Sequence, residues 1–360
     1  TATTEFYTLS VHDALPICKV MKAYSLQAKI QHPILISDEK MIAYLVGQRF
    51  HVQERFLGLL ISPSNIILFL NELFPTHLTG LKIVRFNDAD DPIQRLNEHI
   101  HSGLLYVDKH LRAGFLLKLM RLNPLLNIEL DDMADQVRAI KDKDEIETMR
   151  IASQINDAVM SEVKALCVPG IREKEIAMQI ENLFISKGAT GISFSPIIAF
   201  GKNTADPHAI PNDTELKEGM PVIIDMGCVY QGYCSDMTRS FIIGENKTME
   251  EIYPIVKRAN LAAIDAVRPG ALFRDIDKAA RDVIREAGYG DAFIHRTGHG
   301  IGQDVHEPYD VSPNSEVVAQ VGMIFSIEPG IYLPSLGGIR IEDLVVVTED
   351  GCEVLNHSKK

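Results

Sequence analysis

A short stretch of the chain, HRTGHGIGQDVH, places three histidines between residues 295 and 306. His295 and His299 are four positions apart, which is the spacing of the two histidines in a helical HExxH zinc site. Arg296 stands where that motif requires a glutamate, and the glycines around His299 disfavour a helix. The stretch is therefore not a zinc helix that depends on histidines alone.

Two aspartates lie at the ends of neighbouring apolar runs. Asp225 closes MPVIIDMG and Asp236 opens DMTRSFIIG, with Gln231-Gly232 between them as a turn. Two strands joined in this way would bring both carboxylates to the same region of a sheet. Taken singly, each aspartate also fits an ordinary strand end or turn, where the residue is common.

Two glutamates follow in strongly apolar surroundings. Glu328 comes after the run in FSIEPG, and Glu342 lies inside IRIEDLVVV, which predicts a strand. Lone carboxylates are disfavoured there unless they are paired or bound to metal. A turn before proline is the alternative for Glu328, and an edge-strand charge is the alternative for Glu342. Arg340 would share a strand face with Glu342, so an ion pair between them is also open.

Four such carboxylates and a histidine from the glycine-rich stretch would gather on neighbouring strands or an adjoining loop. Their charge of -4 is self-repulsive and would require strongly raised pKa values in the absence of metal. Two divalent cations would neutralise it. Oxygen-rich ligation with one imidazole suits manganese, cobalt, iron or catalytic zinc better than a closed structural zinc site.

The elements that must position these residues alternate along the chain. Helical spacing predicts helices at 38–47 and 110–123, and short apolar runs predict strands at 33–38, 55–62, 65–71, 81–87 and 103–109. This alternation predicts an α/β domain over residues 21–140.

A charged segment that turns into helical spacing at 140–166 marks a domain boundary near Lys141, with a second domain over 141–360. Further helices are expected at about 172–187, 248–267 and 273–287, and strands at 220–227, 236–244, 323–333 and 339–348. No internal repeat is evident.

The composition and charge of the chain exclude some classes of function. The chain has 360 residues and a net charge of -13, which argues against nucleic acid as the main partner. No apolar run reaches the length of a membrane span. Five scattered cysteines without a CxxC pair favour a reducing, cytoplasmic setting. Residues 1–20 lack the pattern of a signal peptide, and we expect them to be a non-native or disordered segment before Met21.

The order Asp225, Asp236, His299, Glu328, Glu342 resembles the metal-binding pattern of the pita-bread metallopeptidases of family M24, which include prolidase, aminopeptidase P and methionine aminopeptidase. The strings DMGCVYQGYCSDMTRSF, TGHGIGQDVHEP, SIEPGIY and GGIRIEDLVVVTEDG carry this resemblance. It covers residues from about 22 to 357. It implies an α/β (α+β) protein, with a C-terminal pita-bread (creatinase/aminopeptidase) fold after a smaller N-terminal α/β domain of the creatinase/prolidase type.

The resemblance implies a role for each ligand. Asp225 would bind one metal ion through both oxygens, Asp236 and Glu342 would bridge two ions, and His299 and Glu328 would complete the coordination shell of the second ion. Glu328 would also act as the acid/base. The implied cofactor is a pair of divalent ions, with manganese expected and cobalt, zinc or iron as alternatives.

The remaining polar residues match positions on the substrate side. The family pattern places His208 of DPHAIPND, His295 and His306 there, with Arg340 beside the bridging glutamate. His208 and His306 would stabilise the reaction intermediate or bind the substrate backbone. The alternative for the three histidines is a satisfied polar or surface role.

The implied reaction is hydrolysis of the peptide bond preceding proline, with an Xaa-Pro dipeptidase favoured. An Xaa-Pro aminopeptidase that acts on longer peptides shares all of these residues and stays open. A non-catalytic pita-bread module that binds peptides or proteins is a third possibility, although such proteins lose ligands that are intact here. Methionine aminopeptidase usually lacks such an N-terminal domain. The expected partners are a proline-containing peptide and a second copy in a homodimer, with no nucleic acid and no membrane.

Overall fold

We describe residues 21–101 and 103–360 in a computed structural model. The expected non-native segment, residues 1–20, lies outside the described residues. The chain divides between Arg138 and Ala139 into two compact units, which are taken separately below. Among the described residues, no helix has both the length and the apolar character needed to cross a membrane.

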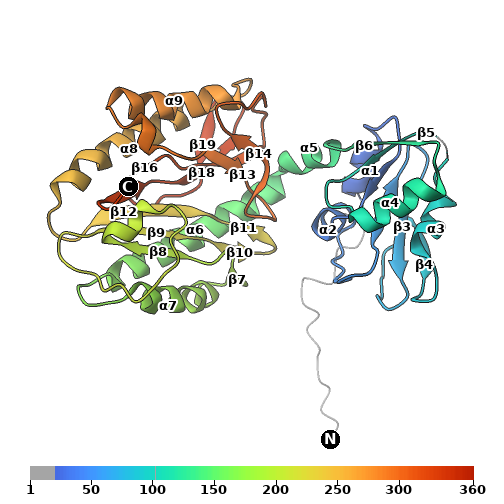
Figure 1. The fold of residues 1–360 in the computed structure, drawn as a ribbon, viewed down its shortest axis with the longest axis horizontal. Helices are drawn as coiled ribbons and strands as arrows, with labels where there is room; N and C mark the ends of the chain where they lie inside the picture. Colours follow the sequence, from blue (N-terminus) through green and yellow to red (C-terminus); the bar gives the residue numbers. More distant parts are fainter. Residues whose placement is uncertain (1–20, 102) are drawn as a thin grey trace, which may run out of the picture. The chain divides into compact units, whose positions relative to one another are not determined.

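The first unit is built on one six-stranded sheet with the order β4-β3-β2-β1-β5-β6 (Figure 1). The β1–β2 and β2–β3 pairs are antiparallel, and the β1–β5, β5–β6 and β3–β4 pairs are parallel. The strands are β1 Ile34–Ile36, β2 Gly58–Ile61, β3 Ile66–Asn71, β4 Lys82–Phe86, β5 Gly103–Val107 and β6 Leu126–Leu130. The helices are α1 Met21–Gln27, α2 Glu39–Val46, α3 Pro92–Asn97, α4 Ala113–Leu122 and α5 Met133–Ala139.

Both faces of this sheet are covered. Ile34 and Ile36 belong to a buried cluster that includes α1 and α2, whereas Leu35 belongs to a second cluster with residues of α3 and α4. Side chains alternate between the faces of a strand, so strands covered on both sides read as continuous apolar runs. The predicted α/β layering is confirmed.

The second unit contains two helix pairs, each packed on its own strands. The first pair is α6 Lys143–Leu166 and α7 Glu173–Ser186, and the second is α8 Lys247–Ala266 and α9 Phe273–Glu286. All four helices were predicted to within a few residues. Asp142 caps α6, and the Asp142 and Glu145 side chains form a reciprocal capping box.

The first helix pair covers a three-stranded sheet with the order β12-β9-β8. Its strands are β8 Ile197–Phe200, β9 Pro221–Met226 and β12 Met237–Ile242, and the 3₁₀ helix η2 Gly201–Ala205 follows β8. A second small sheet, with the order β11-β10-β7, contains β7 Gly191–Ile192, β10 Cys228–Tyr230 and β11 Tyr233–Cys234.

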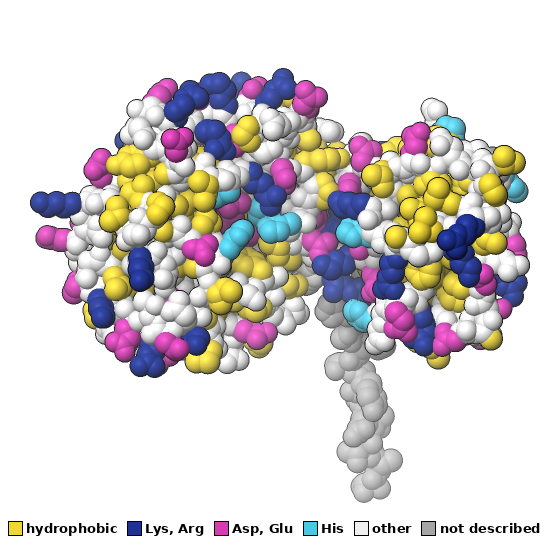
Figure 2. Space-filling model, viewed as in Figure 1, with side chains coloured by type: hydrophobic (Ala, Val, Ile, Leu, Met, Phe, Trp, Pro, Cys, Tyr) yellow, Lys and Arg dark blue, Asp and Glu magenta, His cyan; other side chains and the backbone are white. Residues whose placement is uncertain are grey.

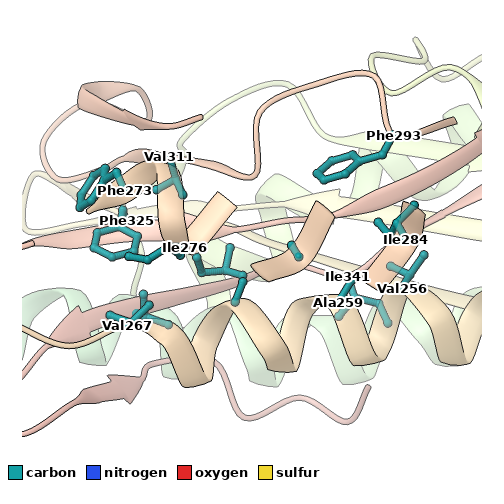
Figure 3. Packing of buried hydrophobic residues seen from close by; sticks show 14 of the residues in the cluster. Val256, Ala259, Val267, Phe273, Ile276, Ile284, Phe293, Val311, Phe325 and Ile341 are labelled. Atoms are coloured by element: carbon teal, nitrogen blue, oxygen red, sulfur yellow. The ribbon is translucent and has the colours of Figure 1, made fainter. Parts of the chain in front are cut away.

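The second helix pair packs on a five-stranded sheet, β14-β13-β15-β18-β19, and on a two-stranded one, β16-β17. The strands are β13 Gly298–Gly300, β14 Glu307–Val311, β15 Ile324–Ile327, β16 Gly330–Leu333, β17 Gly337–Arg340, β18 Asp343–Val347 and β19 Cys352–Val354, and η3 Gly290–Ala292 precedes β13. Figure 3 shows this packing, in which Val256 and Ala259 of α8 and Ile276 and Ile284 of α9 lie near Phe325 of β15 and near Ile341, which follows β17.

The helix pairs form a repeat that the sequence had not made evident. α7 and α9 each have 14 residues, and they begin at Glu173 and Phe273, 100 positions apart. Pro169-Gly170 precedes α7, and Pro269-Gly270 precedes α9. Gly170 and Gly270 both have positive φ values, of 97° and 85°, so both turns need glycine. The second unit thus has two halves of related construction.

Candidate metal centre and active-site cavity

A cavity of about 580 Å³ opens in the second unit. Every residue predicted for the site lines it: His208, Asp225, Asp236, His295, His299, His306, Glu328, Arg340 and Glu342. Histidine side chains gather at one place on the face of this unit that Figure 2 shows. The cavity wall also contains Phe194, Ile197, Pro207, Arg296 and Val305, which were not predicted for the site. A volume of this size lies within the range of small-molecule sites, roughly 300–1,000 Å³.

The two aspartates lie side by side because β9 and β12 pair antiparallel. Asp225 stands opposite Thr238 in the register, and Asp236 directly precedes β12. Between them the chain leaves this sheet through β10 and β11. Gly227 allows this exit, because a Cβ at that position would lie 1.9 Å from the Ser235 carbonyl oxygen. The expected proximity of the carboxylates is confirmed, although the turn at 231–232 belongs to the excursion.

The two glutamates lie at breaks between sheets. Residues 323–333 and 339–348 were each predicted as one strand, and each is two: β15 and β16 on either side of Glu328, and β17 and β18 on either side of Glu342. The interpretation of Glu342 as lying inside a strand was therefore wrong. β15 and β18 pair in the larger sheet, while β16 and β17 form a separate hairpin. The side chain of a residue at such a break does not have to follow the alternation of either sheet.

His299 lies at the centre of the short strand β13. The flanking glycines allow neighbouring segments of backbone to approach closely, because a Cβ at Gly298 would lie 1.8 Å from the Ser326 carbonyl oxygen, and one at Gly300 would lie 2.3 Å from the Pro308 oxygen. His299 Nδ1 lies 3.1 Å from the Gly300 carbonyl oxygen, which leaves Nε2 facing the acidic residues.

The side chains converge around His299 Nε2. This atom lies 3.5 Å from Glu328 Oε1 and 3.8 Å from Asp236 Oδ2. Asp236, His299 and Glu342 each offer a ligand atom, and these atoms lie within 4.8 Å of one another. This trio is a candidate metal-binding cluster, and Glu328 lies beside it.

The electrostatics fit a cation. Burial, and then the neighbouring Glu342 and Asp225 carboxylates, raise the pKa of Asp236 well above its usual range. Burial, and then Glu328 and Asp225, do the same to the pKa of Glu342. Among the described residues, Asp225 Oδ1 and Asp236 Oδ1 are buried with no hydrogen-bond partner. Buried acceptors of this kind are costly, so the donor set fits divalent ions.

His299 is ready to act as a ligand. Burial, and then the neighbouring His306, lower its pKa to about 3, so the imidazole is neutral at physiological pH. Burial raises the pKa of Glu328 to about 7, even though Arg340 favours its ionised form. The two groups adjoin, and their protonation states are set mainly by exclusion of water.

Arg340 pairs with Asp225, and not with Glu342 as one alternative held. Its Nη2 lies 2.7 Å from Asp225 Oδ2, and its Nε donates to Thr238 Oγ1 at 3.0 Å. The Thr238 hydroxyl in turn donates to Glu342 Oε2 at 2.7 Å. Arg340 therefore contacts one acidic side chain directly and reaches the second through Thr238.

Thr238 and Tyr332 are the polar neighbours that the sequence interpretation missed. The Tyr332 hydroxyl accepts from Arg340 Nη1 at 3.0 Å and lies 2.9 Å from His295 Nε2. Both residues stand inside the strings that carry the family resemblance. The spacing from Asp236 to Thr238 puts both on one face of a strand, which was the available signal.

The accessory histidines occupy different depths. His295 is half-buried and held by Tyr332, and burial lowers its pKa to about 4. The His306 ring packs edge-on against that of His299, with centroids 4.3 Å apart. His208 and His306 are exposed in the free protein. These two side chains therefore stand on the accessible side of the cavity.

A buried set of carboxylates with one neutral imidazole under an open cavity is typical of a metal-dependent hydrolase. The sequence pattern of metallopeptidase family M24 matches residues 147–349. An uncharacterized peptidase of Staphylococcus epidermidis is 38% identical over 331 residues, which cover 89% of this chain and 93% of the relative. The chain belongs to metallopeptidase family M24.

Several solved structures are similar to this chain over nearly its whole length. A dipeptidase from Pyrococcus horikoshii has a TM-score of 0.87 at 37% identity and covers 95% of this chain and 98% of its own. A prolidase from Thermococcus sibiricus has a TM-score of 0.87 at 31% identity, covering 96% and 98%. An X-Pro aminopeptidase from Thermotoga maritima has a TM-score of 0.79 at 29% identity, covering 93% and 97%. The expected pita-bread metallopeptidase fold is confirmed.

Proposed function

We propose that this metallopeptidase hydrolyses the peptide bond preceding proline, and that its main substrates are Xaa-Pro dipeptides. The observation that carries the proposal is that all five candidate ligands, the three accessory histidines and Arg340 line one cavity. The similarity to a dipeptidase and a prolidase supports the same specificity. The bond before proline lacks an amide hydrogen and has a fixed φ, so it requires a dedicated enzyme.

In this proposal two divalent ions, with manganese expected and cobalt, zinc or iron as alternatives, bind in the acidic cluster. Asp225 would hold one ion, Asp236 and Glu342 would be shared by both ions, and His299 and Glu328 would complete the coordination of the second ion. When bound, the ions would supply Lewis acidity and would lower the pKa of a coordinated water molecule. The orphaned oxygens of Asp225 and Asp236 support this assignment.

The other side chains handle protons and substrate. Glu328, whose carboxyl is buried beside His299, carries a proton toward the leaving proline nitrogen. His306 and His208 stand on the accessible side, where they donate hydrogen bonds to the substrate or to the charge that develops on the scissile carbonyl oxygen. Arg340 orients Asp225 and keeps its second oxygen in place.

Xaa-Pro aminopeptidase activity on longer peptides is the second candidate. The exposure of His208 and His306 favours it, because a peptide that passes these residues can extend beyond the cavity. A non-catalytic binding module is disfavoured by the intact donor set. Methionine aminopeptidase shares the metal pattern and is distinguished by its substrate.

The test compares Xaa-Pro with Xaa-Pro-Yaa peptides, each with chelator and with added manganese. Faster metal-dependent cleavage of the dipeptides supports the proposal, and a preference for the longer peptides selects the aminopeptidase. Cleavage of Met-Ala peptides instead identifies a methionine aminopeptidase. A metal-loaded protein that binds these peptides but cleaves none of them is a binding module.

A further inference from the structure

The sheet breaks that carry Glu328 and Glu342 are not held by a regular ladder. Ile327 pairs with Asp343, and Gly330 with Arg340. Between these pairs one long backbone bond remains, from the Ile341 N–H to the Pro329 carbonyl oxygen at 3.4 Å. The Glu328 N–H donates to the Thr297 carbonyl at 2.7 Å, and the Glu342 N–H donates to that of Thr238 at 3.1 Å. Each glutamate backbone is therefore fixed from a different neighbouring segment.

The carbonyls that directly precede the two glutamates share one donor. Asn260 Nδ2, from α8, donates to the Ile327 carbonyl oxygen at 2.9 Å and to the Ile341 carbonyl oxygen at 3.4 Å. Both acceptors are carbonyls, which sets the orientation of the amide. Its Oδ1 accepts from Lys360 Nζ at 2.6 Å. One side chain thus spans both breaks.

Burying the Asn260 amide among apolar side chains costs desolvation free energy. Asn260 is fully buried, and Val256, Ala259 and Ala263 of the same helix belong to the apolar cluster beneath the strands. An apolar side chain would fill this position without the desolvation cost of an amide. The hydrogen bonds of Asn260 to the two carbonyls and to Lys360 offset that cost.

We propose that Asn260 is a positioning residue of the metal centre. It holds the backbone immediately before Glu328 and Glu342, so that both carboxylates reach the same ions. The inference rests on the proposed metal-dependent function and adds a residue outside the cavity lining to it. Partners in the outer shell of metal ligands typically contribute about 10- to 100-fold to metal affinity.

The test is manganese binding to the full-length, metal-free protein, measured by calorimetric titration with MnCl₂ alone. Asn260→Ala should weaken binding of at least one ion by about 10- to 100-fold. It should also alter the electron paramagnetic resonance signal of the coupled manganese pair. Asn71→Ala is the matched control, because Asn71 is a buried amide of the first unit that donates to Asp88. It should leave manganese affinity unchanged.

Equal manganese affinity and an unchanged resonance signal in wild type and Asn260→Ala would overturn the inference. If alanine prevents folding, the isosteric Asn260→Asp, which lacks the donor, is measured with the same expectation. A wild-type protein that binds neither manganese nor cobalt, zinc or iron would instead contradict the proposed function. Binding without hydrolysis of Xaa-Pro peptides would contradict the activity alone and leave the role of Asn260 measurable.

Discussion

Arg239 offers a sharp test of how the strands beneath the metal centre are held. Its guanidinium is fully buried and lies 2.8 Å from Asp343 Oδ1, whose side chain is also fully buried. It further donates to the carbonyl oxygens of Ser358, Thr238 and Glu342. A single side chain therefore satisfies one carboxylate and three main-chain acceptors around β12 and the break at Glu342.

Arg239→Met keeps most of the side-chain packing and removes all of these donors. Removing one partner of a buried ion pair costs about 3–5 kcal/mol. Asp343 retains Lys360, 2.5 Å from its other oxygen, which favours the lower end of that range. For a unit of this size, such a loss lowers the unfolding temperature by roughly 10 °C.

The assay is differential scanning calorimetry with EDTA present, because a bound metal adds stability by mass action. The chain has no tryptophan, so heat capacity is a better signal than intrinsic fluorescence. Arg274→Met is the matched control: Arg274 and its partner Glu316 are 43% and 85% exposed, and the expected loss is below about 1 kcal/mol. Equal effects of the two substitutions would refute the reasoning.

Three further predictions concern the site. Asp236→Ala should abolish hydrolysis and lower the metal content, measured by mass spectrometry, because it removes a proposed bridging ligand; full activity would contradict that role. His306→Ala should lower turnover by about 100-fold or more with metal content unchanged, and loss of the metals would instead make His306 a ligand. Burial raises the pKa of Glu328 from 4.5 to about 7, so the stabilising effect of its protonated form is complete below pH 4.5 and disappears as the pH rises through 7. Metal-free wild type should therefore lose up to about 3 kcal/mol relative to Glu328→Gln between pH 5 and 8 in denaturant titrations, and parallel pH curves would contradict this.

The long helices were predictable because their signals are local. Residues predicted as helices at 172–187 and 273–287 form α7 and α9 within one residue at each end. An apolar stripe at helical spacing and a Pro-Gly turn before each helix are sufficient signals. The shorter α1, α3 and α5 were not predicted, since one or two turns carry too little periodicity.

The breaks at Glu328 and Glu342 were less accessible to prediction. A continuous apolar run does not show that the chain changes its partner strand, and only Pro329 hinted at an interruption. The ion pair of Arg340 with Asp225 joins residues 115 positions apart, so no local spacing reveals it. The four carboxylates of the cavity were nevertheless accessible to prediction, because isolated carboxylates in apolar runs are chemically conspicuous. The proposed choice of His299 as the imidazole ligand came from the family resemblance.

The two-half construction of the second unit has a consequence for how metal and fold depend on each other. Asp225 and Asp236 lie in the segment between α7 and α8, and His299, Glu328 and Glu342 lie in the segment that follows α9. If these five residues bind the ions as proposed, each half is by itself an incomplete chelator. A chain cut at the exposed Gly244-Glu245 connection would yield fragments whose reassembly is favoured by divalent cations. Peptide hydrolysis would then report the association of the fragments, and the ions would act as a removable cross-link between them.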